Sequence, residues 1–331
     1  MYESYYGFKE RPFQLTPNTN CFYASRLHKK ALAYLQYGLN QGEGFIVITG
    51  DVGTGKTTLA NQLLSQLNQD EIVAKQIVTP KLGPDDLIRM IASSFNLTVS
   101  EQNKASYLDA ISIYLKRLHS QHRRALLLVD EAQNLPLESI EELRMLSNFQ
   151  IDGKPLLQSF LLGQNELNPI IQAPNMEQFR QRIIASTNLV ALSEAETQEY
   201  IEFRLHMVGD DNKIIHDACY PAIFRFSRGI PRRINLLMDR VLLLGYLEGL
   251  KQLGTEHVDS VIQEISEEVA HQVPTLPTPS SMHFNEPQAA KPKSTTDGSI
   301  QQLLDDSIEQ KLRLLKELDE AIRLKQQNSG S

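Results

Sequence analysis

The chain has 331 residues, of which 41% are hydrophobic and 22% charged, a normal balance for a globular protein of two or three domains. The formal net charge of -7 argues against a surface built as a whole to bind nucleic acid, although it leaves a local basic patch open. The two cysteines, Cys21 and Cys219, are too far apart in sequence to form a CxxC metal or redox motif.

Strands and helices alternate along the first two thirds of the chain. Short apolar runs predict strands at residues 45–49, 72–78, 125–129, 156–162 and 188–192. Amphipathic spacing predicts helices at residues 56–68, 85–95, 105–119, 137–149 and 193–207. The last of these helices should begin with a capping box formed by Ser193 and Glu196. Alternation of this kind predicts an α/β fold with a doubly wound parallel sheet.

From about residue 214 the pattern becomes entirely helical. Helices are expected at residues 218–227, 231–247 and 255–269. Pro231 suits the first turn of its helix, because the N–H that proline lacks has no helical partner there. We therefore expect an α/β domain at residues 1–210, followed by a small all-helical domain at residues 211–270.

The composition changes after residue 270. Residues 271–298 hold five prolines among Ser, Thr and Gln, which predicts a disordered linker. Residues 299–326 then return to helical spacing, with apolar side chains at steps of three and four from Ile300 to Ile322. Such an amphipathic helix either docks on the chain's own body, or forms a coiled coil or binds a partner. The long linker favours a coiled coil or a partner.

A glycine-rich segment after the first expected strand matches the motif G-x-x-x-x-G-K-S/T in full. It consists of Gly50, Asp51, Val52, Gly53, Thr54, Gly55, Lys56 and Thr57, followed by Thr58. The glycines let consecutive N–H groups point at phosphate oxygens, and the following helix adds its positive end. Lys56 should reach the β- and γ-phosphates, and the Thr57 hydroxyl should bind Mg²⁺. The sequence therefore predicts a nucleotide site.

The expected strand at residues 125–129 is followed by two adjacent carboxylates, Asp130 and Glu131. The carboxyl ends of parallel strands line the crevice where α/β sheets bind ligands. Asp130 is expected to hold Mg²⁺ through water, and Glu131 to orient and polarise the attacking water. Although a lone Asp-Glu pair is a weak signal, the phosphate loop upstream makes it specific. We therefore expect ATP binding and hydrolysis with Mg²⁺.

Phosphoryl transfer also needs positive charge near the departing phosphate. Arg180 and Arg182 precede the last expected strand, and Arg232 and Arg233 open a helix of the helical domain. Each pair alone is more often an ordinary surface charge. Gln164 follows an expected strand and could contact the water or the γ-phosphate. Adenine is the expected base, because no Asn-Lys-x-Asp element for guanine is present.

Together these features resemble the AAA+ ATPases, and most closely the general secretion pathway protein A group. The resemblance covers residues 1–269. The sequences of its motifs are most similar to those of the secretion ATPases found at exosortase (PEP-CTERM) and exopolysaccharide loci. The segments that carry it include Tyr2-Glu3-Ser4-Tyr5-Tyr6-Gly7-Phe8, Phe22-Tyr23-Ala24-Ser25, Asp130-Glu131-Ala132-Gln133-Asn134-Leu135 and Gly229-Ile230-Pro231-Arg232-Arg233-Ile234-Asn235.

The resemblance implies roles that spacing does not show. Gln164 is similar to the sensor-1 residue, and Arg232 to sensor 2 on the helical lid. Arg182, or alternatively Arg180, is similar to the arginine finger that enters a neighbouring subunit's site. Residues 22–28 would border the adenine. An arginine acting on a neighbour implies a homo-oligomer.

The sequence departs from the general secretion members, which join their ATPase to a membrane span and a peptidoglycan-binding part. No apolar run approaches the roughly 18–20 residues of a membrane helix, and no secretory signal opens the chain. We therefore expect a cytoplasmic protein that reaches the inner membrane only through a partner, with residues 299–326 as the contact. Gln164 also differs from the Asn or Thr common at sensor 1.

Three functions are consistent with these features. The first is an ATP-hydrolysing motor or assembly factor for a secretion, exopolysaccharide or exosortase-linked export system. The second is an ATP-dependent oligomeric switch with negligible hydrolysis. The third is a DNA-handling AAA+ protein similar to transposition helpers, and the net acidity and the lack of a long basic run argue against it.

Overall fold

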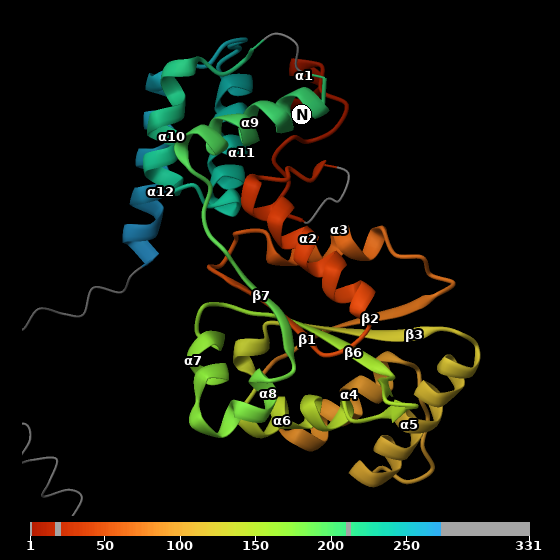
Figure 1. The fold of residues 1–331 in the computed structure, drawn as a ribbon. Coiled ribbons are helices and arrows are strands. Elements are labelled where there is room, and N and C mark those ends of the chain that lie inside the picture. Colours follow the sequence, from red (N-terminus) through yellow and green to blue (C-terminus); the bar gives the residue numbers. More distant parts are fainter. Residues whose placement is uncertain (1, 17–20, 210–212, 273–331) are drawn as a thin grey trace, which may run out of the picture. The chain divides into compact units, whose positions relative to one another are not determined.

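A five-stranded parallel sheet forms the centre of the structure, a computed structural model that describes residues 2–16, 21–209 and 213–272 (Figure 1). The strand order is β2-β3-β6-β1-β7. The strands are β1 (Phe45–Gly50), β2 (Ile72–Val78), β3 (Arg124–Asp130), β6 (Leu157–Leu162) and β7 (Ile183–Leu189). Because β6 lies between β1 and β3, the residues that follow these three strands meet at one edge of the sheet. The predicted parallel α/β sheet is confirmed.

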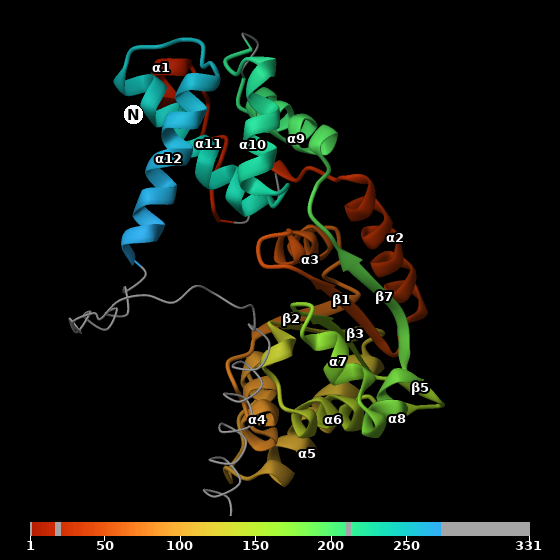
Figure 2. The ribbon, with the colours of Figure 1, turned by 90° about the vertical axis from the view of Figure 1, so that its left-hand side faces the viewer.

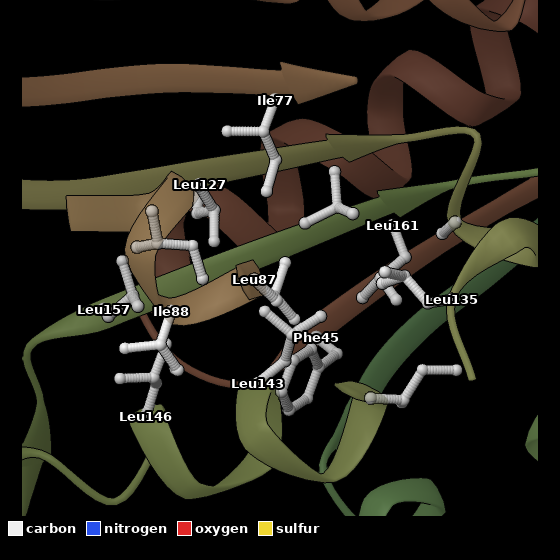
Figure 3. Packing of buried hydrophobic residues seen from close by; sticks show 14 of the residues in the cluster. Phe45, Ile77, Leu87, Ile88, Leu127, Leu135, Leu143, Leu146, Leu157 and Leu161 are labelled. Carbon is white, nitrogen blue, oxygen red and sulfur yellow. The ribbon is translucent and has the colours of Figure 1, made fainter. Parts of the chain in front are cut away.

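Helices cover both faces of this sheet (Figures 1 and 2). One face carries α2 (Arg26–Gln41) and α3 (Lys56–Ser65); the other carries α4 (Pro84–Ser94), α5 (Lys104–Ser120) and α6 (Leu137–Leu146). Because helices cover both faces, β1 and β6 are buried throughout and are mostly apolar. The buried side chain of Gln158 in β6 donates to the carbonyls of Gly38 (2.7 Å) and Glu43 (3.0 Å). Figure 3 shows the larger core, in which side chains of β1, α4 and α6 interdigitate.

Within the described residues, four helices surround a second core. They are α9 (Glu194–Met207), α10 (Tyr220–Ser227), α11 (Pro231–Leu247) and α12 (Thr255–Gln272). Because α9 belongs to this core, the helical domain begins before the boundary expected at residue 211. The short N-terminal helix α1 (Tyr2–Tyr6) belongs to the same core, where Tyr2 and Phe13 are buried. The capping box of Ser193 and Glu196 is present at the start of α9, as predicted.

Short elements complete the described chain. They are η2 (Ala132–Asn134), β4 (Gln150–Ile151), β5 (Lys154–Pro155), α7 (Leu167–Gln172), η3 (Pro174–Met176), α8 (Glu177–Arg180) and η4 (Asp217–Cys219). Within the described ranges, no helix combines the length and apolar character that a membrane span requires.

The prediction of a last strand at residues 188–192 is wrong, because β7 runs from Ile183 to Leu189. This strand pairs only with β1 and lies at the sheet edge, so it tolerates the polar run Ser186-Thr187-Asn188 that hid it from an apolar pattern. Leu192 instead packs in the helical core, and its N–H donates to the Gly229 carbonyl at 2.9 Å.

The predicted helix at residues 255–269 continues to Gln272, so the linker does not begin at residue 271. No helix breaker occurs before Pro274, whose ring disfavours helical backbone at the preceding residue. The rest of the predicted linker, residues 273–298, and the predicted helix at residues 299–326 lie outside the described residues.

Candidate active site

The phosphate loop connects β1 to α3 and depends on glycine. Gly53 (φ 83°) and Gly55 (φ 99°) have left-handed backbone, which other residues rarely adopt. A Cβ on Gly53 would lie 2.6 Å from the Cβ of Arg232, and one on Gly55 would lie 3.1 Å from Nε2 of His28. The loop therefore needs glycine at both positions, and residues from elsewhere in the chain contact its outer side.

Lys56 is buried in this loop, with 7% of its surface exposed. Its Nζ donates to the carbonyls of Gly50 (2.8 Å) and Asp51 (2.9 Å). An ammonium has three donors, and the third has no partner among the described residues. Burial lowers the pKa of Lys56, while the carboxylates of Glu131 and Asp130 oppose that shift. The loop thus presents a poorly hydrated cation, whose attraction for an anion is stronger than in water.

Thr57 and Asp130 face each other across the site. The Thr57 hydroxyl donates to Oδ2 of Asp130 at 2.9 Å, and Gln76 Nε2 reaches the same oxygen at 3.3 Å. The other carboxylate oxygen accepts the Glu131 N–H at 2.9 Å. A hydroxyl and a carboxylate are the hard oxygen ligands that Mg²⁺ prefers. The two residues predicted to bind the metal are therefore adjacent, and their chemistry fits it.

Glu131 follows Asp130 in left-handed backbone (φ 55°), an uncommon conformation for a residue with a side chain. Its Oε2 accepts two amide N–H bonds, from Gln133 Nε2 at 2.6 Å and from Gln164 Nε2 at 3.3 Å. The Thr79 hydroxyl binds the backbone carbonyls of Asp130 and Glu131 at 2.8 and 3.1 Å. Gln164 is beside Glu131 because β6 lies next to β3. Gln133 lies in the segment from Asp130 to Leu135 that carries the family resemblance, but the sequence alone predicts no role for it.

A pocket of about 220 Å³ opens beside the phosphate loop. Besides the loop, its lining includes Gln14, Leu15, Thr16, Cys21, Phe22, Tyr23, His28, Tyr200, Arg204, Arg232 and Asn235. Helical-domain side chains hold the N-terminal part of this wall. Asn235 donates to the Gln14 carbonyl at 3.0 Å, and buried Arg204 donates to the carbonyls of Pro12 (2.7 Å) and Cys21 (3.0 Å). The pocket thus has room for a group attached to a bound phosphate.

His28 supports the phosphate loop from behind and is 4% exposed. Its Nε2 lies 3.1 Å from the Thr54 carbonyl, and its Nδ1 lies 2.7 Å from Oγ of Ser25. Because a carbonyl only accepts, Nε2 carries the proton and Nδ1 accepts from the serine. Burial lowers the pKa of His28 below its ordinary value of 6.5.

This burial of His28 predicts a pH-dependent stability. Above pH 6.5 the imidazole of His28 is neutral in both the folded and the unfolded chain. As the pH falls below that value, His28 in the unfolded chain takes up a proton, whereas buried His28 in the folded chain stays neutral. The contribution to the free energy of unfolding should fall by at most about 1.4 kcal/mol per pH unit. Urea unfolding at pH 7.5, 6.5 and 5.5 should show the wild type losing its advantage over His28→Gln as the pH falls. A pH-independent difference would contradict this.

The predicted arginines separate into two groups. Arg232 lines the pocket and donates its backbone N–H to the Gly53 carbonyl at 3.3 Å; Arg233 borders a neighbouring hollow together with Gln164. Arg180 donates to the carbonyls of Ile171 (2.8 Å) and Ala173 (2.7 Å), which end α7. The guanidinium of Arg182 binds Ser147 and Asn148. Neither Arg180 nor Arg182 lines the pocket beside this chain's own phosphate loop.

Two comparisons of the amino-acid sequence with known proteins found related proteins. Residues 39–171 match the family described as AAA domain. General secretion pathway protein A from Aeromonas hydrophila is 38% identical over 267 residues, which cover 80% of this chain and 49% of that protein.

Among solved structures, Cdc6p from Pyrobaculum aerophilum has a TM-score of 0.60 at 16% identity, over 82% of this chain and 74% of that one. The Aeropyrum pernix ORC2 protein, in ADPNP-ADP complexes, has a TM-score of 0.58 at 17% identity, over 78% and 72%. At these identities the likeness shows the fold alone.

The strand order, the phosphate loop after β1 and the carboxylates after β3 place this chain among the AAA+ proteins. Over 80% of its length the chain is also related to general secretion pathway protein A, at 38% identity. The chain spans about half the length of that relative, 49%.

Proposed function

We propose that this chain binds ATP with Mg²⁺ at residues 50–58 and hydrolyses it. One observation carries the proposal. The buried Lys56 ammonium, the Thr57–Asp130 pair and the Glu131 carboxylate meet at one edge of the sheet. A cation for phosphate oxygens, oxygen ligands for a metal and a base for water are the parts that phosphoryl transfer needs.

Each residue has a separate part in the proposed reaction. Lys56 neutralises the phosphate tail, and Glu131 orients the attacking water and accepts its proton. Gln164, whose amide reaches the Glu131 carboxylate at 3.3 Å, helps to hold that water or the γ-phosphate. Arg232 adds positive charge from the helical domain. Mg²⁺, held by Thr57 and Asp130, would supply charge neutralisation on the phosphate oxygens.

Adenine is the base that we propose for the pocket lined by Phe22, Tyr23 and His28. An aromatic and apolar wall suits a purine ring. The structural neighbour ORC2 from Aeropyrum pernix, which is known in complexes with ADPNP and ADP, supports the same choice.

We further propose a homo-oligomer in which Arg182 completes the site of a neighbouring subunit. Arg182 does not line its own chain's pocket, and its present partners, Ser147 and Asn148, are neutral, so the guanidinium charge is available to a phosphate. Arg180 is the weaker candidate, because two backbone carbonyls of its own chain hold it.

Mixing two inactive variants tests this arrangement. Arg182→Ala and Lys56→Ala should each have little ATP turnover, whereas an equimolar mixture should recover a clear fraction of the wild-type rate. Recovery is expected because a site with intact Lys56 can receive the arginine of its neighbour. Turnover in the mixture no higher than the sum of the two variants would contradict an arginine supplied between subunits.

For the biological role, we propose a motor or assembly factor of a secretion system, with an exopolysaccharide or exosortase-linked export system as the specific case. The name of the Aeromonas hydrophila relative supports the general part. Residues 299–326 would bind a partner of the export machinery at the inner membrane, and the chain itself would remain cytoplasmic. Loss of export-system proteins from pull-downs with Leu304→Asp/Leu312→Asp, compared with the wild-type chain in ATP, tests this contact.

A further inference from the structure

The side-chain amide of Gln133 lies between two residues of the candidate site. Its Nε2 donates to Oε2 of Glu131 at 2.6 Å, and its Oε1 accepts the backbone N–H of Gln164 at 2.9 Å. A carboxylate only accepts and an N–H only donates, so the amide can be oriented in one way only. Gln133 therefore joins the end of β3 to the end of β6 through two directional bonds.

The surrounding backbone leaves room for this amide. Gly163 precedes Gln164, and a Cβ at that position would lie 3.1 Å from Oε1 of Gln133 and 2.8 Å from Cδ2 of Leu167. A larger residue would therefore press on the amide and on α7. Glycine at this position keeps the Gln133–Gln164 bond possible.

The direction of the Glu131 carboxylate must be fixed by hydrogen bonds from other residues. Its side chain has three rotatable bonds, and its left-handed backbone holds only the position of Cα and Cβ. Of the two amide donors to Oε2, Gln133 is closer by 0.7 Å, the difference between 3.3 and 2.6 Å. Hydrogen bonds to an ionised acceptor are about twice as strong as neutral ones. The bond from Gln133 is thus the main restraint on the direction of the carboxylate.

We infer that Gln133 is a positioning residue that sets the Glu131 carboxylate relative to the end of β6, an inference that rests on the proposed hydrolysis. Gln133 is not among the described residues that line the pocket beside Lys56. It acts on the reaction only through Glu131 and Gln164. The rate of the chemical step therefore depends on Gln133, whereas ATP affinity does not.

The kinetic test uses Gln133→Met, which keeps the size of this half-buried side chain and removes both hydrogen bonds. We expect kcat to fall by about 10- to 100-fold, because a small misplacement of a catalytic group has an effect of this size. The dissociation constant of ATP should stay within about threefold. The matched control is Gln263→Met, since Gln263 donates to the Glu267 carboxylate at 2.9 Å on α12, far along the chain from the site.

The outcomes separate a positioning role from a structural one. Lower kcat with unchanged affinity and unchanged melting temperature supports the inference, whereas unchanged or higher kcat overturns it. A parallel loss of affinity, turnover and melting temperature also overturns it, because that pattern means a role in folding.

A spectroscopic readout keeps the inference separate from the proposed function. In the full chain labelled with ¹⁵N-glutamine, the Gln133 side-chain NH₂ signals can be assigned by their loss in Gln133→Met. They should shift when Glu131→Ala removes the acceptor, even if the wild type shows no turnover. Unchanged signals would overturn the inference, whereas absent turnover alone would refute only the proposed hydrolysis.

Discussion

Replacement of Glu131 by glutamine is expected to lower ATP turnover by about 100-fold or more, the usual effect of removing a general base. The substitution keeps the size of the side chain, and the amide oxygen can still accept the N–H bonds of Gln133 and Gln164. Local structure should therefore persist while the proton acceptor is lost. Phosphate release at saturating Mg·ATP, together with ATP affinity from calorimetry, measures both effects.

The affinity measurement shows whether the loss belongs to chemistry. ATP should bind the Glu131→Gln variant within about threefold of the wild type, because Lys56 and the loop amides are intact. Glu138→Gln, at an exposed acid in the first turn of α6, is the matched control and should leave both quantities unchanged. Wild-type turnover in Glu131→Gln would remove this residue from the catalytic role.

Replacement of Lys56 by alanine is expected to weaken ATP binding by about 100-fold and to remove measurable turnover. Two losses combine in this variant. The site loses a buried cation at the phosphate tail, and the loop loses the bonds from Nζ to the carbonyls of Gly50 and Asp51. Fluorescence titration with an ATP analogue measures the affinity, and circular dichroism checks that the fold is retained.

Lys154→Ala provides the control for net charge, because it removes an equal charge from an exposed position in β5. Its affinity for the analogue should equal that of the wild type. A folded Lys56→Ala variant that binds as tightly as the wild type would place the phosphates somewhere other than this loop.

The parts that sequence predicted best are those in which short-range pattern and chemistry coincide. The phosphate loop needs its glycines and Lys56 in consecutive order, and a buried parallel strand such as β3 needs an unbroken apolar run. Both can therefore be recognised in the amino-acid sequence. β7 is predicted too late in the chain, because an edge strand paired on one side tolerates polar residues that interrupt the apolar pattern.

Other parts of the site depend on contacts between distant segments. Gln133 acquires its place only when β3 and β6 become neighbours, and Arg204 only when the N-terminal segment packs against α9. The arginines show the same limit. Sequence offered four candidates of equal chemistry, whereas the fold puts Arg232 against Gly53 and directs Arg180 to backbone carbonyls of its own chain.

The central claim is that the loop before Lys56 holds the phosphates of ATP, with a metal held by Thr57 and Asp130. Calorimetric titration of the purified full chain with ATP, with and without Mg²⁺, tests it most directly. We expect saturable binding, with one nucleotide per chain, that is strengthened by Mg²⁺ and weakened about 100-fold in Lys56→Ala. A folded wild-type chain that releases no heat and shows no saturation with millimolar Mg·ATP would contradict it.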